Sequence, residues 1–270
     1  MSDYIFSFIG CGNMGGALAR AAAKNVPADQ MLLCDKARHM ARALADDLRC
    51  AVGNTDDAAG KSDYIFLGVK PQMLRELMTN IAPVLAQRSD HFVLVSMAAG
   101  VTISQICEMA GKEYPVIRIM PNIPCAVGEG MILFDTNALV TPDDLSAFLR
   151  YMSGAGMLDQ LDEHLIDAGS AVSGCGPAFV SLFIEALADG GVTCGLPRQK
   201  AMMYARQMVA GSARLLAGST FPHPGSLKDA VCSPGGSTIE GVRVLEQQAF
   251  RGAVTDAVVA AFQRTKELGK

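Results

Sequence analysis

The sequence has no cluster of lysine and arginine, and its 270 residues carry a formal net charge of -4. Both features argue against a nucleic-acid partner, because binding to a phosphate backbone needs a concentrated positive surface. The eight cysteines are scattered, without a C-x-x-C pair and without a nearby histidine at ligand spacing. We therefore expect free, buried thiols in a reducing cytoplasm, with neither disulfides nor a metal site.

Long hydrophobic runs are also missing, and none reaches the length of a membrane span. The longest, around Ala178–Ala188, contains Glu185 and ends at Asp189-Gly-Gly191. The first residues, Met1-Ser-Asp-Tyr4, hold an acid where a signal peptide needs positive charge. We therefore expect a cytoplasmic protein without membrane contact. Half of the residues are nevertheless hydrophobic and only 19% are charged, which indicates apolar surface buried between subunits.

The first part of the chain alternates short apolar runs with stretches of helical length. Strands separated by such helices form a parallel sheet with right-handed crossovers. We predict an α/β fold whose N-terminal domain, residues 1–163, is a Rossmann-type doubly wound sheet. The expected strands are Tyr4–Ile9, Met31–Cys34, Ala51–Gly53, Tyr64–Val69, Phe92–Ser96, Val116–Met120, Met131–Phe134, Leu139–Val140 and Met157–Leu161. The expected helices are Ala17–Lys24, Arg38–Leu48, Gln72–Ile81, Ile103–Ala110 and Pro142–Met152.

Residues 164–270 are almost purely helical in pattern, and Pro177–Leu187 is apolar on nearly every face. A helix of this kind needs burial on all sides, which a region of about a hundred residues supplies poorly by itself. We therefore predict an all-α C-terminal dimerisation domain that packs against a second subunit; a self-contained helical domain is the alternative. Its other expected helices are Pro197–Ala217, Leu227–Val231, Thr238–Gln247 and Phe250–Leu268.

A glycine-rich motif, Gly10-Cys-Gly-Asn-Met-Gly15, lies between the first expected strand and the first expected helix. In this setting G-x-G-x-x-G is typical of dinucleotide binding. Gly10 makes the tight turn, Gly12 lets the pyrophosphate approach the backbone, and Gly15 permits close packing of helix on strand. A glycine turn without a ligand is the alternative.

The residues that would choose the cofactor conflict with one another. Asp35 ends the second expected strand, twenty positions after Gly15, where a carboxylate bonds the ribose hydroxyls of NAD. Lys36 and Arg38 follow it and are able to hold the 2′-phosphate of NADP. A solvated loop would also explain all three. These residues leave NADPH or NADH open.

Ligands of a doubly wound sheet bind outside the carboxyl ends of the strands. The expected loops there carry glycine or proline, and one adds Asn122, whose side chain donates and accepts. Turn chemistry explains each loop alone, but their shared edge indicates a site. The loops are Gly10–Gly15, Val69–Pro71, Ser96–Gly100 and Met120–Pro124.

A second glycine-rich loop, Ser233-Pro-Gly-Gly-Ser-Thr238, feeds an expected helix. Gly235 and Gly236 permit positive φ angles, and Ser237 with Glu240 has the spacing of a capping box. The unpaired N–H groups and positive dipole end of that helix would bind a small anion such as a carboxylate. An ordinary loop-to-helix junction is the alternative.

Motifs along nearly the whole chain resemble the pyrroline-5-carboxylate reductase family, the last enzyme of proline synthesis. The segments that carry the resemblance are Ile9–Gly15, Val69–Pro71, Ala98–Val101, Met120–Asn122, Ser173–Ala178, Glu185–Gly191, Gly195–Pro197, His223–Asp229, Ser233–Glu240 and Leu245–Glu246. The resemblance implies reduction of Δ1-pyrroline-5-carboxylate to proline by NADPH or NADH. It also implies a homodimer or ring of dimers with an inter-subunit active site.

The resemblance assigns site residues as well. Thr238 corresponds to the hydroxyl near the imine nitrogen and is the expected catalytic residue. The expected substrate-binding residues are Glu163, Ser233, Gly235, Gly236, Ser237 and Thr238. With those discussed above, the expected cofactor-binding residues are Gly10, Gly12, Asn13, Met14, Gly15, Asp35, Lys36, Asn54 (or Thr55), Val69, Lys70, Pro71, Ala98 and Asn122.

The sequence departs from the family pattern at three positions. Ile123 replaces a usual threonine, Ala230 stands where some members have a polar residue, and Asp35 is unusual and weakens strict use of NADPH. Two other functions remain open: a β-hydroxyacid-type dehydrogenase that uses a lysine as its acid–base group, and a regulator that binds NAD(P) without turnover. Lys70, in a cofactor-side loop, is poorly placed for the first, and the second leaves the Ser-Pro-Gly-Gly loop without a purpose.

Overall fold

The centre of the first part of the chain is a sheet whose strands are buried on both faces. A computed structural model describes residues 2–218 and 220–268, and in them eight strands pair in the order β3-β2-β1-β4-β5-β6-β7-β8. Continuous apolar runs form these strands because helices cover both faces of the sheet. The strands are β1 Tyr4–Ile9, β2 Met31–Cys34, β3 Ala51–Val52, β4 Ser62–Leu67, β5 Val93–Ser96, β6 Val116–Met120, β7 Gly130–Thr136 and β8 Gly156–Gln160.

Strands β1 to β6 pair in parallel, whereas β7 pairs antiparallel with β6. The predicted parallel sheet is therefore confirmed for β1 to β6, whereas β7, which the sequence predicts only as a further strand, runs antiparallel. Parallel neighbours need a crossover of about a dozen residues or more. The link between β6 and β7 spans only residues 121–129 and contains the short 3-10 helix Ile123–Val127, so the chain reverses instead.

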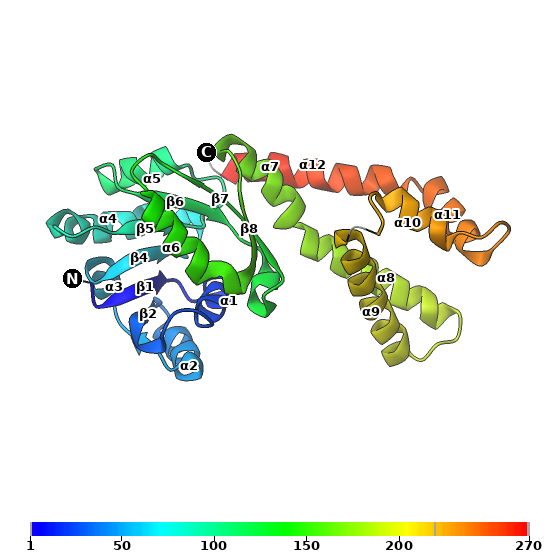
Figure 1. Cartoon of the computed structure of the whole chain (residues 1–270), viewed down its shortest axis with the longest axis horizontal. Helices are drawn as coiled ribbons and strands as arrows, with labels where there is room; N and C mark the ends of the chain where they lie inside the picture. The colour runs from blue at the N-terminus through cyan, green and yellow to red at the C-terminus, as the bar shows by residue number, and fades with distance from the viewer. Residues whose placement is uncertain (1, 219, 269–270) are drawn as a thin grey trace. The chain divides into compact units, whose positions relative to one another are not determined.

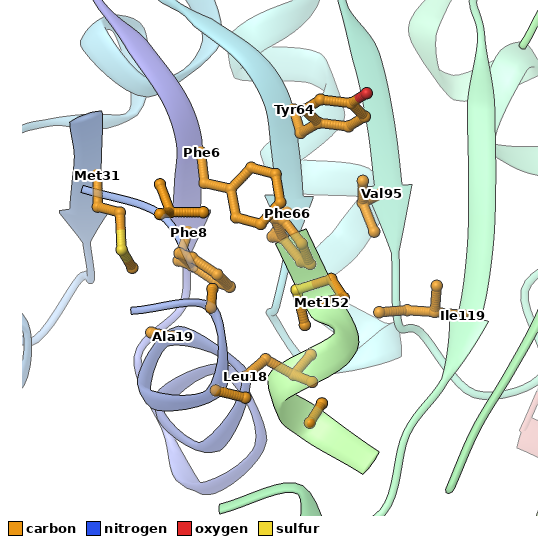
Figure 2. Close-up of a cluster of buried hydrophobic side chains, with 14 of the residues drawn as sticks. Phe6, Phe8, Leu18, Ala19, Met31, Tyr64, Phe66, Val95, Ile119 and Met152 are labelled. Atoms are coloured by element: carbon orange, nitrogen blue, oxygen red, sulfur yellow. The ribbon is translucent and has the colours of Figure 1, made fainter. Parts of the chain in front are cut away.

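Helices on both faces make the sheet doubly wound, as predicted (Figure 1). On one face, Phe8 stacks on Phe66 with ring centroids 4.3 Å apart, and Leu18 and Met152 close the core over them (Figure 2). The opposite face has a core of its own, built around residues such as Leu74 and Ile106. The helices of the first face are α1 Asn13–Ala22, α2 Arg38–Leu48 and α6 Pro142–Met152, and those of the second are α3 Thr55–Gly60, α4 Pro71–Gln87 and α5 Ile103–Ala110.

Two local predictions fail for identifiable reasons. Leu139–Val140, expected as a strand, is a turn. Asn137 precedes it, accepting the Val116 N–H at 3.1 Å and donating to the Tyr114 carbonyl at 2.7 Å, which ends the ladder there. The sequence prediction also missed helix α3, whose N-cap Asn54 accepts the Asp57 N–H at 2.8 Å. This capping signal could have been found in the sequence.

The chain divides into two compact units, one of Met1–Cys175 with Ala261–Lys270 and one of Gly176–Ala260. The predicted boundary after residue 163 stays a prediction, and helix α7, Glu163–Ser173, lies within the first unit. The remaining helices are α8 Gly176–Thr193, α9 Arg198–Ala217, α10 Pro224–Val231, α11 Ser237–Gln247 and α12 Phe250–Leu268.

The second unit buries very little of its own apolar surface. Among its described residues the buried hydrophobic side chains are those of Ala188, Ala201 and Ala205, while larger ones such as Leu182 are exposed. By length and composition alone, Glu163–Thr193 contains an 18-residue window, with mean hydropathy 1.6, that is apolar enough to cross a membrane. This corrects the expectation that no apolar segment is long enough. Length and composition alone do not distinguish a membrane span from a helix that another protein surface covers.

Candidate cofactor and substrate sites

In the glycine motif after β1, a different physical reason favours glycine at each of the three positions. Gly10 has φ +107°, and a Cβ on it would lie 2.6 Å from the Gly68 carbonyl oxygen. A Cβ on Gly15 would collide with the carbonyl oxygen of Gly10, so this glycine lets α1 approach the strand end. A Cβ on Gly12 would meet no atom within 4 Å. The first and third glycines thus serve the fold, and the second leaves open space.

That open space belongs to a cavity of about 730 Å³ at the carboxyl ends of β1, β2 and β4. Its size suits a nucleotide cofactor. Of the expected cofactor residues, those that line it are Gly10, Gly12, Asp35, Lys36, Asn54, Val69 and Lys70. These expected residues therefore share one wall of a single cavity, and their contact with a cofactor stays a prediction.

The other expected cofactor residues do not line this cavity. Asn13 and Met14 begin α1, Gly15 packs beneath the loop, Pro71 is the first residue of α4, and Ala98 is buried. The sixth, Asn122, uses its amide elsewhere. It donates to the Ser173 carbonyl at 3.0 Å and accepts the Met131 N–H at 2.9 Å, fastening the loop after β6. Cofactor contacts from these residues stay predictions.

The cavity has a second wall that sequence analysis missed. It is one face of α4, together with Thr55, which the sequence offered only as an alternative to Asn54. The α4 residues recur at i, i+3, i+4 and i+7, a spacing that places them on one side of a helix. With the proline at N1 of α4, this spacing was a readable signal. The α4 residues are Met73, Glu76, Leu77 and Asn80.

Two thiols near the cavity are chemically quiet. Burial, reinforced by the negative charge of Asp35, raises the pKa of Cys11 to about 12 and that of Cys34 to about 11. The reactive form of cysteine is the thiolate, so both thiols stay protonated at neutral pH. Among the residues that the structure describes, no group of three or more His, Cys, Asp or Glu side chains could hold a metal ion.

The second glycine loop differs from its predicted form at the helix start. Gly235 has φ +68°, and the N-cap of α11 is Gly236 rather than Ser237, which is the first helical residue. The predicted capping box is therefore wrong: Glu240 instead accepts from the Arg243 Nε at 2.9 Å. Because the N-cap has no side chain, no side-chain cap satisfies the first N–H groups of α11 within the described part of the chain. Thr238, the second helical residue, is exposed.

Glu163, expected to touch substrate, forms hydrogen bonds to other parts of the fold. Its Oε1 accepts the Ile103 N–H at 2.7 Å and an N–H from the Arg118 guanidinium at 3.3 Å. Arg118, only 2% exposed, also donates to Asp167 at 2.7 Å. These bonds fasten α7 to α5 and β6, and Glu163 is not among the residues that line the cofactor cavity. Its role toward substrate stays a prediction.

Fold and cavity together define a protein with a Rossmann-type dinucleotide-binding domain. A family model described as pyrroline-5-carboxylate reductase dimerisation matches residues 163–268, and one described as NADP oxidoreductase, coenzyme F420-dependent, matches residues 5–100. The chain belongs to the pyrroline-5-carboxylate reductase family, as its relatives demonstrate.

Similar proteins match over nearly their full length. The pyrroline-5-carboxylate reductase of Escherichia coli (strain K12) is 40% identical over 97% of each chain. That of Glycine max is 38% identical over 98% of this chain and 96% of its own. The crystal structure of Plasmodium falciparum pyrroline carboxylate reductase with NADP bound is 31% identical, has a TM-score of 0.89 and covers 100% of both chains. The family resemblance inferred from the motifs is thereby confirmed.

Proposed function

We propose that this chain reduces Δ1-pyrroline-5-carboxylate to L-proline by hydride transfer from NADPH or NADH, the closing step of proline biosynthesis. The observation that carries the proposal is the open space beside Gly12 within the cavity at the strand ends, in a chain of this family. A pyrophosphate can approach the backbone closely only where no Cβ stands in the way. When bound, the nicotinamide cofactor supplies the hydride.

The cofactor would be held by residues already lining the cavity. We propose that the N–H groups at the start of α1 receive the pyrophosphate, since those of Gly10 and Cys11 already donate to the Cys34 carbonyl and the Asp35 carboxylate. Asn54, Thr55 and the α4 face would enclose the adenosine, and the loop of Val69 and Lys70 would lie toward the nicotinamide. The two alternative functions lose support, because the full-length relatives are named reductases of this family.

The substrate carboxylate would bind at the start of α11. Gly235 and Gly236 bring no side chain of their own to the start of α11, where the Ser233 hydroxyl lies close to Gly236, and the first N–H groups of the helix carry the positive end of the dipole. A carboxylate is therefore stabilised there, with the Ser233 and Ser237 hydroxyls close in sequence. A bulky residue at Gly235 is expected to weaken substrate binding, because its φ of +68° disfavours any side chain.

Thr238 is the proposed catalytic residue. Hydride is added to the imine carbon, which is more electrophilic when the imine nitrogen is protonated. The Thr238 hydroxyl donates or accepts a hydrogen bond at that nitrogen and holds the ring in position. The reaction then needs orientation more than a strong acid or base.

The test follows the loss of nicotinamide absorbance with pyrroline-5-carboxylate and, separately, with a 2- or 3-hydroxyacid and oxidised cofactor. Consumption with the first substrate supports the proposal; turnover of the second alone, or silence with both, contradicts it. In Thr238→Ala we expect kcat to fall about 10- to 100-fold while NAD(P)H binding persists, since one positioned hydrogen bond is lost. Ser212→Ala, on α9 outside the proposed site, is the matched control.

We further propose that the working form is a homodimer, or a ring of dimers, in the cytoplasm. The family model that matches residues 163–268 is named for dimerisation. The exposed apolar side chains of the second unit support a partner of the same chain. In such an assembly the active site would be completed between subunits, with the Ser233–Thr238 loop facing a nicotinamide.

A further inference from the structure

We infer that Asp35 makes this chain select the ribose diol of NADH and disfavour the 2′-phosphate of NADPH. The inference rests on the proposed function and decides a question that the residue types alone leave open. It depends on how the Asp35 carboxylate is bonded, on which charges share its cavity, and on what occupies the start of α2.

The carboxylate of Asp35 is fixed by two backbone donors. Its Oδ2 accepts the Cys11 N–H at 2.7 Å, and its Oδ1 accepts the Ala37 N–H at 2.8 Å. One donor belongs to the glycine loop after β1 and the other to the residue that precedes α2. The acid therefore ties the pyrophosphate loop to the end of β2 and cannot turn away without breaking both bonds.

The bonding leaves the carboxylate able to bind a diol. An ionised carboxylate has about four lone-pair sites, two on each oxygen. The Cys11 and Ala37 N–H groups take one on each oxygen, so one acceptor site per oxygen remains. Asp35 lines the cofactor cavity. Two neighbouring acceptors match the 2′- and 3′-hydroxyls of an unphosphorylated ribose, both of which donate.

A 2′-phosphate would meet a negative charge at the same place. Asp35 already supplies the anion at the start of α2, where it accepts the N–H of the N-cap residue Ala37. A phosphate there would compete for the same helix end and repel the carboxylate. Glu76 lines the cavity as well and adds a second negative charge.

Lys36 and Arg38 are the groups that would favour a 2′-phosphate. Both line the cavity, yet both are exposed, and neither forms a hydrogen bond or ion pair with any residue in 2–218 or 220–268. Long, unanchored side chains lose rotamer freedom when they hold a ligand. The fixed carboxylate is pre-organised, whereas the two cations are not. Pre-organisation therefore favours the diol.

The experiment measures Kd for NADH and for NADPH on the full chain by titration calorimetry, in one buffer at one ionic strength. We expect NADH to bind at least tenfold more tightly. In Asp35→Asn, which removes the charge and keeps the shape, the ratio of the two Kd values should fall at least fivefold. Asp46→Asn removes the same charge from an exposed position of α2 outside the cavity and should leave the ratio unchanged.

Equal or tighter binding of NADPH by the unmodified chain would overturn the inference, and so would an unchanged ratio in Asp35→Asn. The first comparison needs no variant, so poor folding of Asp35→Asn would not rescue the inference. Steady-state reduction of pyrroline-5-carboxylate with each cofactor separates the two levels of the argument. Turnover with NADPH favoured defeats the inference alone, whereas no turnover with either cofactor, despite NADH binding, defeats the proposed function alone.

Discussion

Replacing Gly12 and Gly15 by alanine, one at a time, tests two different roles of the glycine motif. One glycine should be needed for the stability of the fold, and the other for binding of the cofactor. Both glycines belong to the same motif, yet their surroundings differ. A Cβ at position 15 would collide with the backbone carbonyl of Gly10, and the α1 backbone and the turn would have to move apart. At position 12 the added methyl would point into open space.

The expected stabilities follow from these geometries. Overpacking against backbone costs about 1–3 kcal/mol, so Gly15→Ala should lower the free energy of unfolding by about 3 kcal/mol, since the carbonyl is not a movable side-chain end. Gly12 is an N-cap with φ −67°, which alanine adopts easily. Losing a glycine N-cap costs about 1 kcal/mol, and restricting the unfolded chain returns about 0.4–1 kcal/mol. Gly12→Ala should therefore change stability by less than about 1 kcal/mol.

The expected affinities run in the opposite order for a correctly folded protein. If a pyrophosphate lies against Gly12, the extra methyl costs about 1–3 kcal/mol in the complex, which weakens NADH binding about 5- to 150-fold. Urea unfolding without cofactor and calorimetric titration of NADH give the two quantities for each variant. A Gly12→Ala protein that is stable and binds NADH normally would refute the placement of the pyrophosphate. One that is as unstable as Gly15→Ala would refute the assignment of separate roles.

Three further changes test other parts of the chain. Arg118→Met should lower the free energy of unfolding by about 2–3 kcal/mol in urea melts, because it leaves the partly exposed carboxylates of Glu163 and Asp167 without their buried partner; a loss below about 0.5 kcal/mol would contradict this role. Hydrogen bonds from the Arg88 guanidinium hold the pKa of Asp90 well below its usual range, so their contribution is present above the unfolded pKa of about 4 and is lost as the pH falls through the lower folded value. Asp90→Asn should therefore be less stable than the parent at pH 7, with a difference that shrinks toward about pH 2, whereas a difference independent of pH would be inconsistent with this pair. Leu182→Glu puts a charge in place of an apolar side chain that is 68% exposed, and light scattering should show the proposed dimer shifted to monomer at micromolar concentration, while an unchanged mass would exclude Leu182 from the interface.

The sheet and its helices were predictable because each strand is a short apolar run and each helix an amphipathic one. Helices α2, α5 and α6 begin and end where the sequence predicts them. The reversal at β7 was not predictable from periodicity, since apolar alternation has no direction; only the short link after Met120 contained that information. The turn at Leu139–Val140 looks like a strand locally and is decided by the distant bonds of Asn137.

The motif residues of the candidate cofactor site could be predicted from the sequence, whereas the residues that surround them in space could not. The spacing of Gly10, Gly12 and Asp35 in the sequence predicts their place in a cofactor site. The α4 residues line the same cavity only because β4 places that helix beside the loops at the strand ends. Asn122 is the opposite case, and a cofactor contact from it stays a prediction. Its side chain suited a ligand by chemistry, but folding commits both ends of the amide to Ser173 and Met131. A polar residue type in the right loop is therefore weaker support than an unoccupied donor or acceptor.

The second unit buries too little apolar surface to account for its own stability. Its buried hydrophobic side chains, among the described residues, are alanines, whereas Leu182, Met203 and Tyr204 are exposed. Fully burying one leucine-sized side chain contributes about 1.5–3 kcal/mol, so three alanines cannot offset the conformational entropy lost by ordering five helices. Either a membrane or a protein surface must cover the remainder. Along α9 the apolar residues alternate with Arg198, Arg206 and Arg214, and α11 and α12 carry several charges of their own. Charges at that density are costly in hydrocarbon but ordinary at the rim of a subunit interface, so a second copy of the chain fits this surface better than lipid.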